Sequence, residues 1–172
     1  MYVILPIGRK QKHCNRISNI VFIFCGFDKG NLNYIKNQII DNNVQEYFII
    51  FNYLSDYELI SLYLNCFTVI MPSYVGHTVI PMYEAFYFKK NIFFTEGLAD
   101  ENLIEFLTEI NINDIESIRK NYLEIKNNEK KNKDKINKAK EFFNESLSKE
   151  KMANTFIKIF DEYKYIQERW KK

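Results

Sequence analysis

Short apolar segments alternate with amphipathic ones along the first part of the chain. The apolar segments contain many β-branched and aromatic residues. One of them (IVFIFC) has no alternation of polar and apolar positions, which is typical of a strand covered on both faces. The predicted strands are Tyr2–Ile7, Ile20–Cys25, Tyr47–Phe51, Phe67–Met71 and Ile92–Thr95.

Between these strands the apolar residues recur three or four positions apart, which is the period of a helix with one buried face. Asn31–Asn43 is predicted to be such a helix, with Asn31 as its N-cap. Ser55, followed by Glu58 three residues later, forms a capping box for a helix that ends near Asn65.

A third helix is expected to begin at Pro81 and to run to Lys90. Proline suits the first turn because its missing N–H would have no partner there in any residue. Strands that alternate with helices at this spacing predict a single α/β domain, a Rossmann-like, doubly wound parallel sheet with helices on both faces.

After Asp100 the sequence shows helical periodicity only. We therefore divide the chain into a Rossmann-like domain, residues 1–98, and a helical C-terminal extension, residues 99–172, that packs on it. Asn127–Lys140 is dense in Lys, Asn and Glu, which predicts a solvated helix or linker, with a nucleic-acid arm as the alternative. Ser148–Trp170 has an apolar stripe and should pack against something.

Length and composition narrow the function. With 172 residues and a net charge of +2, the chain is about the size of one domain and lacks the field that would favour nucleic acid or anionic lipid. The three cysteines form no metal-binding spacing, so we predict no metal site and no cofactor. No apolar run is long enough to span a bilayer. A cytoplasmic location follows, with peripheral attachment to the inner face of a membrane left open.

The segment Met71–Ala85 (MPSYVGHTVIPMYEA) places a strand end, a loop and a helix start at one point. In doubly wound sheets, ligands bind at the carboxyl ends of the strands. Unpaired amides at a helix N-terminus suit a phosphate, Gly76 permits close approach of the backbone, and Thr78 offers a hydroxyl. Glu84, one turn into the helix, can accept hydrogen bonds from ribose hydroxyls. The alternative is that its carboxylate only favours the positive end of the helix dipole.

This segment resembles the nucleotide-sugar loop of the group 1, glycogen-synthase-like glycosyltransferases of the GT-B fold. In that family a strand ending in Pro-Ser leads to a loop, a proline, and Glu-Ala in the next helix. The stretches IVFIFCGFDKGNLNYIKNQI, FIIFNYLSDYELISLYLNCFTVIMPSY and KKNIFFTEG are similar to the strands, glycine turn and helices around it. The resemblance covers Ile20 to about Thr95 and implies the second, nucleotide-sugar-binding half of a GT-B enzyme.

The sequence departs from the family at two points. The family commonly has a glutamate eight positions before the one at Glu84, and this chain has Gly76 there. Residues Gly76, His77, Thr78 and Val79 instead resemble the Gly-Pro-Thr-Asn loop of a subset, with Thr78 kept for the phosphates and the amide lost at Val79. His77 offers a donor to a phosphate or sugar oxygen, or has no role.

The resemblance implies a set of site residues. Arg9 and Lys12, in the only basic segment after the first strand, would neutralise the diphosphate leaving group, or else belong to an exposed basic loop. With Glu84 they are the predicted catalytic residues. The residues predicted to bind the nucleotide sugar are Gly26, Gly76, His77, Thr78, Val79, Ile80 and Glu84.

The implied activity is transfer of a sugar from a nucleotide-diphosphate sugar to an acceptor hydroxyl, retaining and metal-independent. GT-B enzymes bind the acceptor mainly through a first domain, which we expect to be separately encoded, unless the chain is a truncated form that is inactive alone. The alternative is a non-catalytic interaction module that binds a partner through aromatic residues on a Rossmann-like surface, to which Tyr74, Tyr83, Phe86, Tyr87 and Phe88 could contribute. A flavodoxin-like receiver is disfavoured because no acidic cluster follows the first strand.

Overall fold

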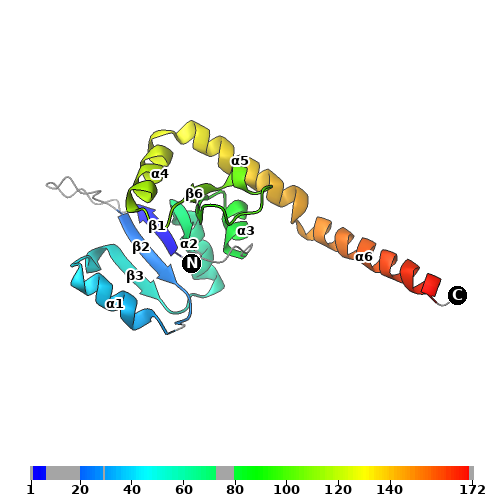
Figure 1. Cartoon of the computed structure of the whole chain (residues 1–172), viewed down its shortest axis with the longest axis horizontal. Coiled ribbons are helices and arrows are strands. Elements are labelled where there is room, and N and C mark those ends of the chain that lie inside the picture. The colour runs from blue at the N-terminus through cyan, green and yellow to red at the C-terminus, as the bar shows by residue number, and fades with distance from the viewer. Residues whose placement is uncertain (1, 7–19, 29, 73–79, 171–172) are drawn as a thin grey trace.

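The computed structural model describes residues 2–6, 20–28, 30–72 and 80–170. These residues form a six-stranded sheet covered by helices on both faces, and a last helix that leaves this body (Figure 1). The strands are β1 (Tyr2–Pro6), β2 (Ile20–Cys25), β3 (Phe48–Phe51), β4 (Thr68–Met71), β5 (Asn91–Thr95) and β6 (Thr108–Ile110).

The helices alternate with the strands up to β5 and then dominate. They are α1 (Leu32–Asp41), α2 (Asp56–Asn65), α3 (Ile80–Tyr87), α4 (Ile115–Asn127), α5 (Glu129–Ser146) and α6 (Lys149–Trp170). Two short 3-10 turns, η1 (Gln45–Tyr47) and η2 (Ile104–Phe106), precede β3 and β6. The predicted strand at Tyr47 therefore begins one residue later, and α3 stops before Lys90.

The strand order is β3-β2-β1-β4-β5-β6, the usual order of dinucleotide-binding folds. The predicted α/β, Rossmann-like class is confirmed. One strand departs from the predicted parallel sheet, because β1 pairs antiparallel with both β2 and β4. A parallel β1 would need a crossover, usually a helix, before β2, whereas an antiparallel pair needs none. The other neighbouring pairs are parallel.

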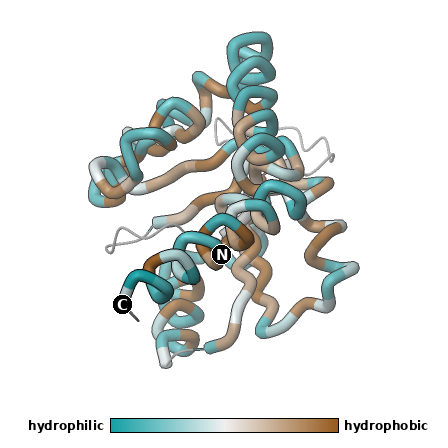
Figure 2. The backbone as a smooth tube through the Cα atoms, turned by 90° about the vertical axis from the view of Figure 1, so that its right-hand side faces the viewer, coloured by the Kyte–Doolittle hydropathy of each residue, from teal (hydrophilic) through white to brown (hydrophobic). Residues whose placement is uncertain are grey.

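Two hydrophobic clusters hold the layers together. On one face of the sheet, Val21, Val69 and Phe94 pack under α2, α3 and α5, and this cluster includes the fully buried Phe86 of α3. On the other face, a smaller cluster joins Phe93 of β5 to α4. Figure 2 shows the hydrophobic residues gathered on the strands and the hydrophilic ones on the outer turns of the helices.

The segment after Asp100 corrects one prediction. Thr108–Ile110 is a strand, β6, that pairs in parallel with β5, so helices are not the only elements in this part. A strand of three residues is too short to give a readable period of two. The division into 1–98 and 99–172 stays a prediction, and β6 extends the sheet beyond that boundary.

The last two helices differ from each other. Asn127 ends α4, and the charged run that follows lies in α5, a largely exposed helix whose buried residue is Ala139, so the prediction of a solvated helix is confirmed. Ser148–Trp170 is a helix as predicted, and its packing stays a prediction, because the described residues of this chain do not cover its apolar stripe. None of the residues of α6 is buried, and the helix projects from the body (Figure 1).

Candidate functional site

The carboxyl ends of five strands meet at one edge of the sheet. These are the parallel strands on either side of β1, and the amino end of β1 joins them because Tyr2 pairs with Phe24 and Ile70. The strand order changes direction beside β1, and ligands of open α/β sheets bind at such a switch, outside the carboxyl ends. The predicted residues Gly26, Ile80 and Glu84 belong to turns and helices that follow β2 and β4.

A cavity of about 240 Å³ lies where β2 and β3 end. Gly26 lines it, together with Asp28 and the first residues of α1. The Gly26 amide donates to the Phe51 carbonyl at 3.1 Å, and its φ of +148° is a conformation that a side chain would strain. Gly26 therefore permits the tight turn that follows β2 and forms part of the wall of this cavity.

The amino end of α1 is occupied by a side chain of its own chain. Asp28 Oδ1 accepts hydrogen bonds from the amides of Gly30 at 2.7 Å and Leu32 at 3.1 Å. These bonds lower the pKa of the Asp28 carboxyl. Asn31 is the N-cap residue of α1, as predicted, but its side chain makes no capping bond, and the Asp28 carboxylate accepts from the amides instead. A phosphate at this helix would have to compete with a carboxylate.

The next helix is also capped from within. The Ser55 Oγ accepts from the Glu58 amide at 3.4 Å, and the Glu58 carboxylate accepts from the Ser55 amide at 2.8 Å, which confirms the predicted capping box. The Ser55 and Glu58 amides are thus used within the chain.

Ile80 begins α3, and Pro81 occupies its first turn as predicted. Glu84 follows one turn later with a half-buried side chain. Its Oε2 accepts a 2.7 Å hydrogen bond from the hydroxyl of Tyr63 on α2, and that hydroxyl also lies 3.4 Å from the Pro81 carbonyl. The carboxylate is therefore not buried in the apolar core, and the hydrogen bond restricts its rotation. It is tied to a neighbouring helix near the amino end of its own.

Tyr63 is the residue at this site that sequence reasoning missed. Only 1% of its surface is exposed, and its ring stacks on that of Phe88 at 5.1 Å between centroids. Burial raises the pKa of the Tyr63 hydroxyl, and the hydrogen bond and charge of Glu84 raise it further, so the hydroxyl keeps its proton. Its spacing from Leu59 and Leu62 predicts only that this tyrosine belongs to the apolar stripe of its helix. The signal that could have indicated a further role is its hydroxyl, because a buried tyrosine hydroxyl usually has a hydrogen-bond partner.

A second missed residue lies at the same edge. Thr95 ends β5 with 8% of its surface exposed, and its Oγ1 is buried without a hydrogen-bond partner among the described residues. Thr68, on the neighbouring strand, differs because its hydroxyl donates to the Asn91 carbonyl at 3.1 Å. An unpaired buried hydroxyl is costly, so Thr95 stands out among the residues that end the strands.

Arg9 and Lys12, and the loop residues Gly76, His77, Thr78 and Val79, lie outside the described residues. The described end of β1, Pro6, pairs with Ile20 at the start of β2, which is the sheet edge opposite Met71. The structure thus brings Ile80 and Glu84 together on α3, and Gly26 stands two strands away, across β1.

A larger cavity lies on the other face of the sheet. It measures about 480 Å³, runs between α1 and α4, and is lined mainly by apolar side chains, among them Phe22, Phe24 and Ile70. β2 was predicted to be covered on both faces, but Phe22 and Phe24 are only half-buried. This groove has the wrong chemistry for a diphosphate, which needs donors and positive charge.

A family model described as glycosyl transferases group 1 matches residues 9–142, more than three quarters of the chain. No curated protein matches the sequence. In the described part of the chain, no helix combines the length and apolar character needed to cross a membrane.

Proposed function

Because the chain belongs to the group 1 glycosyltransferases, we propose that it binds a nucleotide-diphosphate sugar at the carboxyl edge of its sheet and supports transfer of the sugar to an acceptor hydroxyl. The family supports glycosyl transfer in general. The observation that carries the proposed site is the half-buried carboxylate of Glu84, held at the amino end of α3 where β4 ends. Retention of stereochemistry and independence from metal belong to the proposal.

The chemistry of Glu84 suits the ribose of the donor. A carboxylate only accepts hydrogen bonds, and the two ribose hydroxyls are paired donors at a fixed spacing. The amino end of α3 offers amides and the positive end of a dipole, which suits the diphosphate. In this proposal Gly76, Thr78 and the loop amides contact the phosphates, with His77 as a further donor, and Val79 and Ile80 lead into the helix.

The reaction breaks the bond between the anomeric carbon and the phosphate oxygen and forms one between that carbon and the acceptor oxygen. The proton of the acceptor hydroxyl passes to the departing diphosphate. Arg9 and Lys12 are proposed to stabilise the negative charge that develops on it, as positioned cations do. The acceptor is proposed to bind to a separately encoded domain, since a transfer site must hold both reactants. A cytoplasmic location stays a prediction.

The test is equilibrium binding by calorimetry, with uridine diphosphate and guanosine diphosphate as probes. We expect one of them to bind, and Glu84→Ala to weaken binding about tenfold, the loss of charge-assisted hydrogen bonds to the ribose. Glu46→Ala is the matched control, because Glu46 is exposed at the opposite sheet edge and should leave binding unchanged. No binding of either nucleotide at millimolar concentration refutes the proposal.

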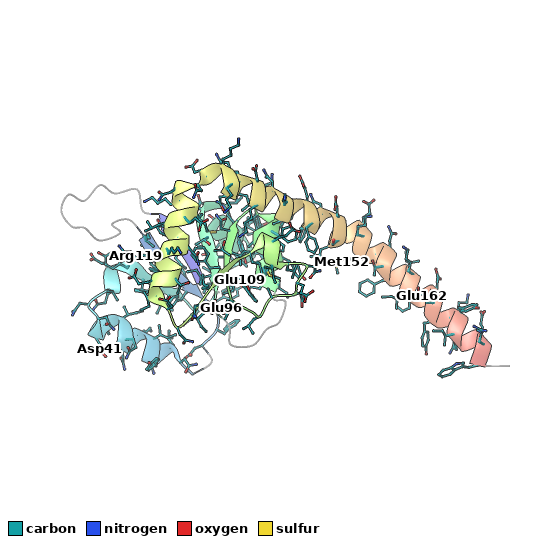
Figure 3. The ribbon with its side chains drawn as sticks, turned by 45° about the horizontal axis from the view of Figure 1, so that its top comes forward. Asp41, Glu96, Glu109, Arg119, Met152 and Glu162 are labelled. Carbon is teal, nitrogen blue, oxygen red and sulfur yellow. The ribbon has the colours of Figure 1, made fainter. Side chains whose placement is uncertain are left out.

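A second candidate, a non-catalytic interaction module, is favoured by a different observation. Six apolar residues of α6 alternate at spacings of four and three, which is the heptad repeat of a coiled coil. They are all exposed: Met152, Phe156, Ile159, Tyr163, Ile166 and Trp170. Figure 3 shows Met152 and Glu162 along this helix, outside the body of the protein. We call these six residues the α6 seam.

The α6 seam is complementary to itself, because two copies share the same spacing and mixed charges flank it rather than a block of one sign. A second copy of the chain is therefore the partner that this candidate names. The aromatic residues that the sequence predicts for partner binding are less suitable than the α6 seam. Phe86 is fully buried, and one face of the half-exposed Tyr87 ring contacts Lys140, whose Nζ lies 3.6 Å from the ring centroid.

A further inference from the structure

The geometry around Tyr63 fixes the direction of its hydroxyl. The ring is buried in the main hydrophobic cluster and stacks on Phe88 with an interplanar angle of 10°. Close packing of this kind leaves the ring one orientation. The hydroxyl therefore stands at a constant point beside the first turn of α3.

The single hydrogen of that hydroxyl has two acceptors within reach. The Glu84 carboxylate is at 2.7 Å and the Pro81 carbonyl at 3.4 Å. A shorter bond to a charged oxygen is the stronger one, so the hydrogen goes to Glu84. The raised pKa of Tyr63 means that this donor persists through the neutral and mildly alkaline range.

One oxygen of the carboxylate is thereby committed. Among the described residues, Tyr63 is the donor to Glu84 Oε2, and Oε1 accepts from none of them. A glutamate on a helix has three rotatable side-chain bonds, and fixing one oxygen removes most of that freedom. Within the described part of the chain, the other oxygen has no donor, and this tether holds it in one direction.

We propose that Tyr63 is a positioning residue, which orients the Glu84 carboxylate for the two hydroxyls of a ribose. This inference rests on the proposed function and names one requirement of the same site. A tether that served stability alone would join α2 to α3 without any effect on which nucleotide binds. A positioning residue must instead change the preference for the ribose diol.

The experiment compares two probes by calorimetry, uridine diphosphate and its 2′,3′-dideoxy analogue, with the guanosine pair in parallel. The measured quantity is the ratio of their dissociation constants, because it isolates the contribution of the ribose hydroxyls. We expect the native chain to prefer the ribonucleotide about tenfold, and Tyr63→Phe to reduce this preference about fivefold while the dideoxy probe binds as before. Tyr83→Phe is the control, because Tyr83 is a half-buried tyrosine of α3, the helix that carries Glu84.

The outcomes distinguish a failure of the Tyr63 role from a failure of the proposed function. If the native chain binds a ribonucleotide with the expected preference and Tyr63→Phe keeps it, the role of Tyr63 is refuted and the proposed function stands. If the native chain binds both probes equally, the ribose role of Glu84 fails, and that of Tyr63 with it. Absence of all binding defeats the proposed function itself.

A second variant protects the test against loss of the fold. The melting temperature of Tyr63→Phe is measured first. Should that variant not fold, Glu84→Asp takes its place, because it keeps the buried ring and the charge but withdraws the carboxylate from the hydroxyl. It should lose the preference for the ribonucleotide, and a preference equal to that of the native chain refutes the inference.

Discussion

The Lys135 ammonium of α5 donates a 3.0 Å hydrogen bond to the Thr108 hydroxyl and a second bond to the Leu107 carbonyl, at the start of β6. These bonds join the charged helix to the edge of the sheet. They also draw an ammonium group out of water, and this burial, with the charge of Lys131, lowers the pKa of Lys135 to about 8.

The lowered pKa of Lys135 predicts a gain of stability at mildly alkaline pH. Below pH 8 the lysine is protonated in both states, so it adds no pH dependence. Above pH 8 the native state loses this proton first while the unfolded chain keeps it, so the unfolded state binds more protons and stability rises with pH. Urea denaturation between pH 7 and pH 9 should show this rise in the native chain and not in Lys135→Met.

This window is chosen because another group opposes the trend at higher pH. Burial raises the pKa of the Cys66 thiol to about 11, so stability is lost as the unfolded thiol ionises above its ordinary value of 9. Lys133→Met, at an exposed lysine of α5, is the control and should follow the native profile. A Lys135→Met variant with the native slope would show that Lys135 is not the source.

The two buried threonines predict opposite effects of the same substitution. Thr68→Val removes a hydroxyl that donates to Asn91 and should lower the free energy of unfolding by about 1 kcal/mol. Thr95→Val removes a hydroxyl without a partner among the described residues and should leave stability unchanged or raise it by up to about 1 kcal/mol. Denaturation of the pair at pH 7 decides it, and an equal loss at both positions would contradict the assignment.

Two features could be predicted from the sequence because each depends on residues that are close together in the chain. The Ser55–Glu58 capping box and the residues Ile20–Cys25 of β2 depend on neighbours in the chain, and both were placed correctly. The direction of β1 and the strand β6 depend on pairing with distant segments. Such pairing leaves little trace in the local period of three to five residues.

The site divides in the same way. Glu84 could be found because its position after Pro81 is a pattern along the chain. Its bond to Tyr63, which precedes it by 21 residues, is a result of how α2 and α3 pack. The apolar stripe of α6 was equally visible, but a stripe shows only that one face is apolar and does not show whether another element covers it.

The bond between Tyr63 and Glu84 predicts a coupling in stability. Tyr63→Phe and Glu84→Ala should each lower the free energy of unfolding by about 1–2 kcal/mol, since each removes or orphans one partner of a partly buried, charge-assisted bond. The double variant should lose little more than either, giving a coupling of about 1 kcal/mol by urea denaturation. Strictly additive losses would mean that the bond is not formed in solution.

The α6 seam predicts self-association if the interaction module is correct. Light scattering after size-exclusion chromatography should then show a dimer that Phe156→Lys combined with Ile159→Lys converts to monomer. Lys158→Glu, between them but outside the seam, is the control and should remain dimeric. A native chain that is monomeric at all concentrations counts against this second candidate and leaves the glycosyltransferase proposal untouched.

The most direct test of the central claim locates the nucleotide on the protein. In a ¹⁵N-labelled chain titrated with uridine diphosphate or guanosine diphosphate, the amide resonances of Ile80, Met82 and Glu84 should shift and saturate together, because the diphosphate lies at the amino end of α3. The same shifts should need more nucleotide in Glu84→Ala. Resonances of α3 that stay in place at millimolar nucleotide, while others move, would contradict the account.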